Sequence, residues 1–365
     1  MINYMKKIVF SGDWILEQAV GIQRYTLQIL LELDKMLLNK STNLEIELLI
    51  PKDGDWDNPF KKIVVVERGK ISSKVEKHLW QQLTFPLYVI TNNAIGIDLA
   101  GAIPIWGCKI CALHDCIREI YPENFDRHGL YLKLYYFKAK HVARSPRVHI
   151  VTLTHDSQTE LQKYYHIPNE RIDIVTCGWE HMMSTNIDDS IFDKINIKIN
   201  EEYFFSLGSK YKHKNFKWVV EAAKRNPKYK FVITGTGIYS DNEIELKKEI
   251  PDNVIFTGYI SNEEIKSLMI HCKALIQPSL YEGFGLPPLE ALSVGAPIIV
   301  SNRSCLPEIY KGAAHYIDPY DYEVDLDKLI AGSVNAPETV LNEYTWAKAA
   351  SQLLDVLNKE ENIDG

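Results

Sequence analysis

Residues 278–292 read PSLYEGFGLPPLEAL, in which two carboxylates, Glu282 and Glu290, flank a turn bracketed by Gly283 and Gly285. Glycine lets a ligand approach the backbone closely, because it has no side chain to obstruct the approach. The two prolines that follow favour the first turn of a helix, where free N–H groups and the helix dipole suit an anion such as a phosphate. The flanking carboxylates suit sugar hydroxyls, which donate hydrogen bonds to them. The stretch therefore predicts a nucleotide-sugar site near residue 285.

The length and composition indicate a soluble protein of two domains. At 365 residues the chain is long for one core, and its apolar content of 46% with a charged content of 24% is typical of globular proteins. The net charge of −7 argues against a nucleic-acid partner. Because no uncharged apolar run approaches the ~20 residues that cross a bilayer, and residues 5–13 are too short for a signal peptide, we expect a cytoplasmic protein.

The six cysteines do not predict a metal site. Only Cys108 and Cys111 have Cys-x-x-Cys spacing, and zinc would need a second such pair or a histidine pair. The surrounding residues resemble a buried strand, so we expect core thiols. No metal and no cofactor are expected.

Apolar strand-like runs alternate with segments of helical period along the whole chain, which is the pattern of βαβ units with parallel sheets. In the first half, strands are expected at 7–12, 44–50, 63–66, 108–113, 149–152 and 172–176, and helices at 21–36, 78–89, 130–143 and 157–165. Residues 95–104 are ambiguous.

A polar stretch between residues 180 and 201 predicts a domain boundary. After it, strands are expected at 203–207, 230–234, 254–256, 274–277, 297–300 and 315–317. Helices are expected at 216–225, 242–249, 262–271, 287–294, 325–330 and 343–357. We therefore expect an N-terminal α/β domain at 1–180, a second at 181–342 and a final helical segment at 343–365, with ligands at the carboxyl ends of the strands.

Three further segments carry polar groups where ligands could bind. Lys210, Lys212, His213 and Lys214 follow the strand expected at 203–207 and suit a diphosphate leaving group, although a solvated basic loop has the same composition. His114 ends another strand, where it could bind a ligand or be structural. The basic and aromatic stretch 127–147 fits either a membrane-facing surface or an ordinary solvated helix face.

The motif Gly235-Thr236-Gly237 follows a strand, as in dinucleotide-binding folds. The third glycine of that fingerprint would fall at position 240, which is Ser240. A tight turn between a strand and a helix explains the pattern better than a nicotinamide site does.

Together these residues resemble the retaining glycosyltransferases of family 4, which have the GT-B fold of two Rossmann-like domains facing a cleft. The resemblance covers most of the chain and is densest from 203 to 321. It rests on the Glu-x7-Glu motif at Glu282 and Glu290, on VIFTGYI at 254–260, and on GAPII and SNRSCLPE at 295–299 and 301–308. The N-terminal half matches more loosely, through GIQRY at 21–25, His114-Asp115 and THDS at 154–157. The mannosyltransferase-like branch that builds capsules and O-antigens is the most similar.

The resemblance implies roles for individual residues. Glu282, Lys214 and His114 would be catalytic: Glu282 would face the donor sugar, Lys214 would neutralise the diphosphate, and His114 would come across the cleft. Glu290 would bind the ribose hydroxyls. The other donor-site residues implied are Gly283, Phe284, Gly285, Leu286, Gly208, Ser209, Lys210, Gly258 and Tyr259, and the acceptor-side residues are Gly21, Gln23 and Arg24. The final helix would cross back onto the N-terminal domain.

Two positions depart from the family pattern. Many relatives have a second basic residue after the glycine that corresponds to Gly208, whereas Ser209 stands here, with Lys210 and His213 available to compensate. Many also have glycine where Gln23 stands, in the loop that shapes the acceptor side. The acceptor is therefore not inferred from relatives.

The sequence thus predicts a retaining, metal-independent glycosyltransferase. It would move a sugar, with a mannose-like hexose favoured, from a nucleotide sugar to a glycan or lipid-linked acceptor, with peripheral contact at the inner membrane face through residues 127–147. Two alternatives remain at this stage: an NAD-dependent dehydrogenase, and a non-catalytic carbohydrate-binding protein of the same fold.

Overall fold

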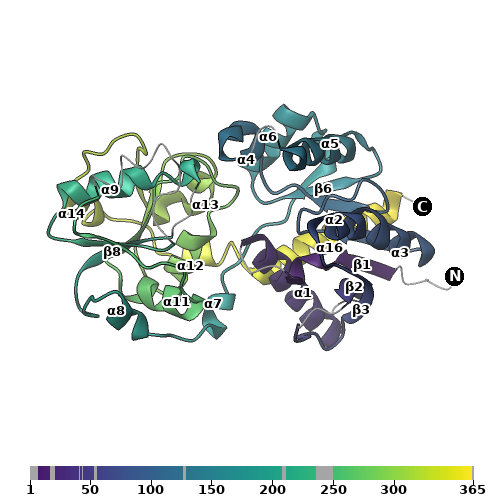
Figure 1. Cartoon of the computed structure of the whole chain (residues 1–365), viewed down its shortest axis with the longest axis horizontal. Coiled ribbons are helices and arrows are strands. Elements are labelled where there is room, and N and C mark those ends of the chain that lie inside the picture. The colour runs from purple at the N-terminus through teal and green to yellow at the C-terminus, as the bar shows by residue number, and fades with distance from the viewer. Residues whose placement is uncertain are drawn as a thin grey trace. The chain divides into compact units, whose positions relative to one another are not determined.

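The computed structural model divides the chain into two units, each built around its own parallel sheet (Figure 1). The first unit comprises Met1–Cys177 and Trp346–Gly365, and the second comprises Gly178–Thr345. Structure is described for residues 7–16, 21–40, 42, 44–52, 56–125, 129–207, 211–235 and 250–363, with side chains up to residue 359. Two α/β units with parallel sheets confirm the fold class that the alternating pattern predicts.

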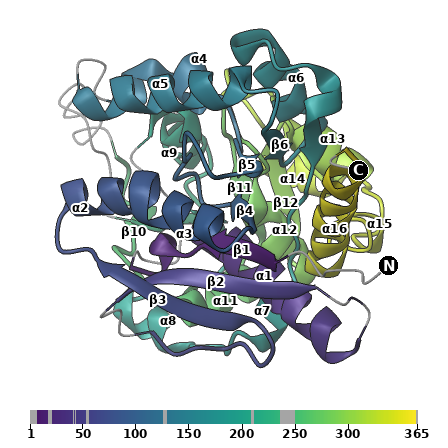
Figure 2. The ribbon, with the colours of Figure 1, turned by 90° about the vertical axis from the view of Figure 1, so that its right-hand side faces the viewer.

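The sheet of the first unit has seven strands in the order β3-β2-β1-β4-β5-β6-β7. Their bounds are β1 Lys7–Ser11, β2 Glu45–Lys52, β3 Val64–Lys70, β4 Ile95–Asp98, β5 Ile110–Ala112, β6 His149–Thr152 and β7 Ile172–Ile174. Strands β2 and β3 lie side by side at one edge (Figure 2). The ambiguous segment 95–104 supplies β4, which pairs with β1 and β5 and is therefore central to the sheet.

The helices of the first unit include several that the sequence pattern did not separate. Their bounds are α1 Gly21–Leu38, α2 Lys74–Leu79, α3 Phe85–Thr91, α4 Ile117–Ile120, α5 Leu130–Arg144, α6 His155–Tyr165 and α16 Trp346–Ile363. The single helix expected at 78–89 is instead α2, a π-helical turn at Trp80–Thr84, and α3.

The final helix α16, drawn in yellow in Figure 1, packs against α1 in the first unit. Trp346 is fully buried, and its ring lies 6.2 Å from that of Tyr25 on α1. Gln352 accepts hydrogen bonds from the backbone N–H and hydroxyl of Thr176 at 2.9 and 3.0 Å. The last residues of the chain therefore complete the core of the first unit.

The second unit has six strands in the order β10-β9-β8-β11-β12-β13. The strands are β8 Tyr203–Ser206, β9 Lys230–Ile233, β10 Val254–Phe256, β11 Ala274–Gln277, β12 Ile298–Ser301 and β13 His315–Ile317. The helices are α7 His181–Ser184, α8 Ser190–Lys194, α9 Phe216–Arg225, α11 Asn262–His271, α12 Leu286–Ser293, α13 Leu306–Tyr310, α14 Leu326–Ile330 and α15 Glu338–Leu341. The helix expected at 242–249 lies outside the described residues.

The polar stretch at 180–201, interpreted from sequence as a boundary segment, contains the short helices α7 and α8. Lys194 of α8 pairs with Glu264 of α11, and Ser267 of α11 donates a hydrogen bond to Asp189. Lys266 holds the end of α7 through the carbonyls of Met182 and Thr185, both at 2.7 Å. The polar residues therefore fix this segment to α11 within the second unit.

Each sheet reverses its strand order at one point, and such a switch point leaves room for a ligand at the carboxyl ends of the strands. In the first sheet the reversal lies between β1 and β4, and in the second between β8 and β11. The loops that follow these four strands are therefore the places to search for function.

Candidate functional site

The loops after β8 and β11 bring together Lys214 and Glu282, as the resemblance implies for the donor site. The Lys214 ammonium contacts both oxygens of the Glu282 carboxylate, at 2.7 and 2.9 Å. Glu282 also accepts hydrogen bonds from Gln277, the last residue of β11, at 2.8 Å and from the Ser279 hydroxyl at 2.7 Å. Because charged hydrogen bonds of this kind are strong, the carboxylate is fixed at the switch point.

These contacts keep Glu282 ionised although it is buried. Burial alone would raise the pKa of its carboxyl, but the positive charge of Lys214 and the hydrogen bonds from Lys214 and Ser279 outweigh burial and lower the pKa. The site therefore holds a carboxylate that accepts hydrogen bonds and an ammonium that attracts an anion, side by side.

His213, adjacent to Lys214, does not supply the second positive charge suggested from the sequence. Its side chain is buried and stacks on Tyr211 with ring centroids 5.6 Å apart. Burial, and then the charge of Lys214, lowers the pKa of His213 to about 4. The ring is therefore neutral near pH 7, because a cation is costly in a buried site beside another cation.

Backbone and side-chain hydrogen bonds tie the two loops to each other. The Leu280 N–H donates to the His213 carbonyl at 2.7 Å. The Asn215 amide donates to the carbonyls of Pro278 and Pro319 at 3.1 and 2.8 Å. Asn215 has φ of 56°, a left-handed conformation that asparagine tolerates better than most residues. It also precedes α9, whose buried Trp218 anchors that helix in the core of the second unit.

The glycine-rich turn presents backbone rather than side chains. Gly285 has φ of +80°, and a Cβ there would lie 2.6 Å from the Leu306 side chain. The Tyr310 hydroxyl donates to the Gly285 carbonyl, which fixes the turn. The Phe284 ring is buried against Tyr344, with centroids 5.4 Å apart. The Phe284 ring therefore faces away from a ligand, and Phe284 and Gly285 could contact a ligand through their backbone atoms.

The α12 helix begins at Leu286, directly after this turn, and carries Glu290. A contact that the sequence did not reveal involves this acid: the His181 ring nitrogen Nε2 lies 2.8 Å from a Glu290 oxygen. Both side chains are buried. The second carboxylate of the motif thus has its own partner, from a helix at the start of the second unit.

Two more predicted donor residues lie beside β9 and β10. Gly258 pairs with Gly235 through two backbone hydrogen bonds, at 2.8 and 3.0 Å. The next residue, Tyr259, is 88% exposed. Its ring is available to a ligand, consistent with the place near the base that the resemblance implies. Gly208, Ser209 and Lys210 lie outside the described residues, as do Thr236 and Gly237.

His114 follows β5 in the first unit, where it is held in one orientation. Its Nε2 lies 2.8 Å from the Leu99 carbonyl, and because a carbonyl only accepts, this nitrogen carries the hydrogen. The ring meets that of Tyr25 edge-on at 5.0 Å. Burial lowers the pKa of His114, so the ring is neutral near pH 7.

The predicted acceptor-side residues share the first turn of α1. Gly21 begins the helix, Gln23 is buried, and Arg24 is partly exposed. The next residue, Tyr25, donates from its buried hydroxyl to the Val175 carbonyl at 3.0 Å. This turn is thus anchored on the same Tyr25 ring that meets His114.

The switch point of the first sheet also contains buried acids that the sequence did not single out. Asp98 ends β4 and accepts backbone N–H hydrogen bonds from Ile103 and Ala100 at 2.7 and 3.2 Å. Burial, with a smaller contribution from the nearby charge of Asp13, raises the pKa of Asp98 to about 6. Asp13 follows β1 and accepts a hydrogen bond from Gln81 at 2.8 Å. These acids lie where a ligand of the first unit would bind.

One basic residue of the stretch 127–147 does not face solvent. Lys138 on α5 is buried, and its ammonium donates to the Ala102 carbonyl at 2.6 Å. Burial lowers the pKa of this ammonium. Arg127 lies outside the described residues. The exposed part of α5 is therefore smaller than the sequence suggested.

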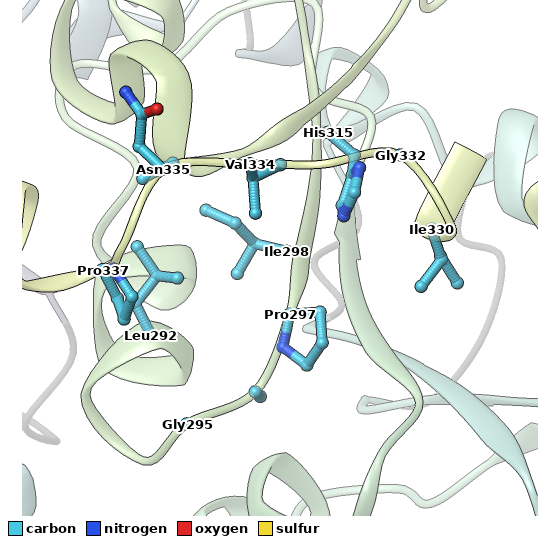
Figure 3. Close-up of a pocket in the computed structure, with 12 residues that line it drawn as sticks. Leu292, Gly295, Pro297, Ile298, His315, Ile330, Gly332, Val334, Asn335 and Pro337 are labelled. Atoms are coloured by element: carbon cyan, nitrogen blue, oxygen red, sulfur yellow. The ribbon is translucent and has the colours of Figure 1, made fainter.

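A pocket of about 280 Å³ lies elsewhere in the second unit (Figure 3). Ile298 and His315, the first residues of β12 and β13, line it together with Val334 and Asn335. It therefore opens at the amino ends of the strands, whereas Lys214 and Glu282 lie at the carboxyl ends.

None of the six cysteines forms a disulfide, and all six are buried, which confirms the expectation of core thiols. Within the residues that the structure describes, no three His, Cys, Asp or Glu side chains gather closely enough to hold a metal ion. Over the same residues, no helix is both long and apolar enough to cross a membrane.

Residues 187–331 match the family model described as "Glycosyl transferases group 1". The chain carries a group 1 glycosyltransferase domain. This domain includes Lys214, Glu282 and Glu290, and the match gives no support to the dehydrogenase alternative.

One curated relative matches a longer part of the chain than the family model does. The O-antigen chain mannosyltransferase RfbU of Salmonella typhimurium is 27% identical over 223 residues, which cover 60% of this chain and 59% of RfbU. The chain therefore matches only about three fifths of that relative.

Two solved structures resemble the whole chain. Sucrose-phosphate synthase from Thermosynechococcus elongatus has a TM-score of 0.70 at 15% identity, covering 97% of this chain and 98% of that one. Alr3699/HepE from Anabaena, solved in complex with UDP and glucose, has a TM-score of 0.65 at 15% identity, covering 97% and 100%. The glycosyltransferase domain belongs to a GT-B fold, which confirms the resemblance seen in the sequence.

Proposed function

We propose that the chain is a retaining, metal-independent glycosyltransferase that moves a hexose from a nucleoside-diphosphate sugar to a glycan or lipid-linked acceptor in surface polysaccharide biosynthesis. The pairing of Lys214 with Glu282 at a switch point, inside a group 1 glycosyltransferase domain, carries this proposal. The likeness to the mannosyltransferase RfbU favours a mannose-like sugar. The UDP and glucose bound in HepE support a nucleotide-sugar donor.

The proposed chemistry follows from the charges at the site. As the bond from the sugar C1 to the diphosphate breaks, the leaving group gains negative charge, and the Lys214 ammonium is placed to neutralise it without a metal. The acceptor oxygen bonds to C1 on the face that the diphosphate leaves, and its proton passes to the leaving phosphate. Glu282, kept ionised by Lys214, accepts hydrogen bonds from the sugar hydroxyls. Configuration at C1 is retained.

A panel of donors tests this proposal. Purified protein would be incubated with UDP-, GDP-, dTDP- and ADP-hexoses, and release of the nucleoside diphosphate measured with and without glycan acceptors. We expect turnover of one donor class, an α-linked product from an α-linked donor by NMR, and unchanged rates in excess EDTA. Binding of a donor with no turnover would instead favour the non-catalytic carbohydrate-binding alternative. Inversion at C1, or loss of activity in EDTA with recovery on adding a divalent ion, would refute the proposed mechanism.

Exposed side chains on α5 support a membrane-bound acceptor. Leu130, Tyr131 and Phe137 are exposed apolar or aromatic residues on this helix. Exposed basic residues accompany them: Lys133, Lys140 and Arg144. Aromatic rings with basic side chains suit the surface of an anionic membrane. We therefore propose that α5 contacts the membrane face where a lipid-linked acceptor resides.

Charge reversal on α5 tests this contact separately. Replacing Lys133, Lys140 and Arg144 by glutamate should reduce co-sedimentation with phosphatidylglycerol vesicles, because each basic residue near an anionic surface contributes about 1 kcal/mol. A matched triple reversal of Lys61, Lys62 and Lys74, exposed residues of the same unit, changes the net charge equally. Equal vesicle binding by the two variants would refute the role of α5.

A further inference from the structure

We propose that His181 is a positioning residue for the donor nucleotide, because it orients Glu290 toward the ribose hydroxyls. The inference rests on the proposed function and on the ribose-binding role that the family resemblance implies for Glu290. It adds a residue from outside the matched family segment, which begins at residue 187. His181 is 109 residues away from Glu290 in the sequence.

The geometry of the pair defines which atom donates. His181 Nε2 and Glu290 Oε1 are 2.8 Å apart, and their side chains are only 8% and 3% exposed. A carboxylate accepts hydrogen bonds and does not donate them, so Nε2 carries the hydrogen. A carboxylate offers about four lone-pair sites, and His181 takes one of them. Accepting from His181 therefore does not prevent the same carboxylate from accepting from a ribose hydroxyl.

Hydrogen bonds fix the short segment that carries His181. His181 is the first residue of α7. After it, the carbonyls of Met182 and Thr185 accept hydrogen bonds from Lys266 of α11. Two residues before His181, the indole N–H of Trp179 donates to the Leu341 carbonyl at 2.9 Å. Because both flanks of His181 are fixed, its ring keeps one orientation, and so does the carboxylate that it contacts.

This arrangement predicts an effect on nucleotide binding rather than on stability alone. A buried carboxylate that loses the histidine contact can turn toward other donors, so ribose binding must then reorder it. Preorganisation removes that cost. Removing the histidine donor should therefore weaken ligands that carry ribose hydroxyls and leave ligands without them nearly unchanged.

Calorimetric titration of the full chain tests the proposal. UDP, GDP and ADP would each be compared with their 2′,3′-dideoxy counterparts. We expect wild type to bind its preferred ribonucleotide at least tenfold more tightly than the dideoxy form, since hydrogen bonds to charged groups are worth roughly that factor or more. His181→Leu should lower ribonucleotide affinity by about tenfold and dideoxynucleotide affinity by less than about twofold.

Three further variants separate positioning from structural support. His181→Gln places an amide donor near the original Nε2 position and should recover most of the preference for ribose, whereas His181→Asn is too short to reach Glu290 and should not. Ser267→Ala removes the hydrogen bond from the buried Ser267 of α11 to Asp189, a contact that includes neither α7 nor Glu290, and should lower the melting temperature while leaving the ribose preference intact. If His181→Leu does not fold, the contrast between His181→Gln and His181→Asn still decides the question.

The outcomes distinguish this inference from the function on which it rests. An unchanged ribose preference in His181→Leu, or equal preferences in His181→Gln and His181→Asn, would overturn the role of His181 while the donor site stands. Loss of the preference in Ser267→Ala would also overturn it, because general loosening would then explain the effect. If wild type binds dTDP but none of the three ribonucleotides, the role of His181 in ribose binding fails, and if it binds none of the four nucleotides the proposed function itself fails.

Discussion

Glu282 in the second unit and Asp98 in the first are both buried acids at the point where the strand order of their sheet reverses. Their pKa values are shifted in opposite directions. Glu282 touches the Lys214 ammonium, and its pKa is lowered despite burial. Asp98 accepts hydrogen bonds from backbone N–H groups, and burial raises its pKa to about 6. The same position in two similar sheets thus holds a permanent anion in one case and an acid that titrates near neutrality in the other.

The two sites differ in the group that accepts a hydrogen bond from the lysine. Lys214 donates to the Glu282 carboxylate itself, whereas Lys138 of the first unit donates to the Ala102 carbonyl. A second acid, Asp13, adds repulsion to Asp98. A fixed anion beside a cation suits a site that binds hydroxyls and a diphosphate. A buried acid whose pKa is raised to about 6 instead loses its charge as the pH falls below that value.

Replacing Lys214 by methionine should break this contrast most severely. Glu282 would become a buried acid without a hydrogen bond from a lysine, and its pKa should rise, as that of Asp98 is raised. We expect the rate of sugar transfer to fall by on the order of 10²-fold or more, because a leaving group loses its charge neutralisation. The free energy of unfolding should fall by about 3–5 kcal/mol, as when one partner of a buried pair is removed.

Lys217→Met is the matched control, because Lys217 lies three residues after Lys214, in the first turn of α9, and is exposed. Transfer rates and urea unfolding of both variants would be measured side by side. Near-normal activity in Lys214→Met would remove this lysine from the mechanism. Equal effects in the two variants would attribute the loss to the net charge rather than to the pair.

The pH dependence of stability should distinguish the two acids. Because the pKa of Asp98 is raised from 3.8 to about 6, the unfolded chain releases its proton first, and the Asp98 contribution falls as pH rises from about 4 to 6. This difference between the folded and unfolded pKa corresponds to about 3 kcal/mol in the free energy of unfolding. Glu282 behaves oppositely, since a lowered pKa adds stability above the unfolded value of 4.5 that is lost as pH falls.

Urea unfolding of wild type and Asp98→Asn at pH 4 and pH 7 measures this contribution. The wild type should be the more stable of the two at pH 4, and this advantage should shrink or reverse by pH 7. A difference between the two proteins that does not change with pH would show that Asp98 keeps an ordinary pKa.

Most of the fold could be predicted from the sequence, because short apolar runs alternate regularly with helical segments. Strand β4 was ambiguous, since it has four residues, contains Gly96 and ends on the buried acid Asp98. Helices α4, α13 and α15 have four or five residues, which is too short for a helical period to appear. These elements depend on tertiary packing rather than on a local pattern.

The candidate site was only partly predictable for a related reason. The motif identified Glu282 and Glu290 because both lie in one continuous stretch of sequence. His181 and Asp98 carry no local signal, since their importance comes from contacts made across the fold. The charge of His213 could not be read from the sequence either, because burial rather than residue type makes it neutral.

Gly285→Ala should show how tightly the turn of the second unit is fixed. Gly285 and Gly295 have nearly the same φ, +80° and +83°, so alanine is strained at both. Only at Gly285 would the new Cβ meet a neighbour, Leu306, at 2.6 Å; at Gly295 no atom lies within 4 Å. We expect Gly285→Ala to cost about 2 kcal/mol more than Gly295→Ala in urea unfolding, the usual cost of overpacking. Equal costs would mean that the turn can relax.

Tyr259→Ala should have the smallest effect and the most selective one. The ring is 88% exposed, so its removal should leave the melting temperature unchanged. If it stacks on the nucleotide base, nucleotide affinity should fall by about fivefold, since an aromatic contact is worth about 1 kcal/mol. Tyr320→Ala, at a residue 62% exposed in the same unit, is the matched control for calorimetric titration. Equal nucleotide affinity in wild type and both variants would show that the base does not stack on Tyr259. The ion pair of Glu282 with Lys214 would then remain as the proposed donor contact that distinguishes this unit from the first.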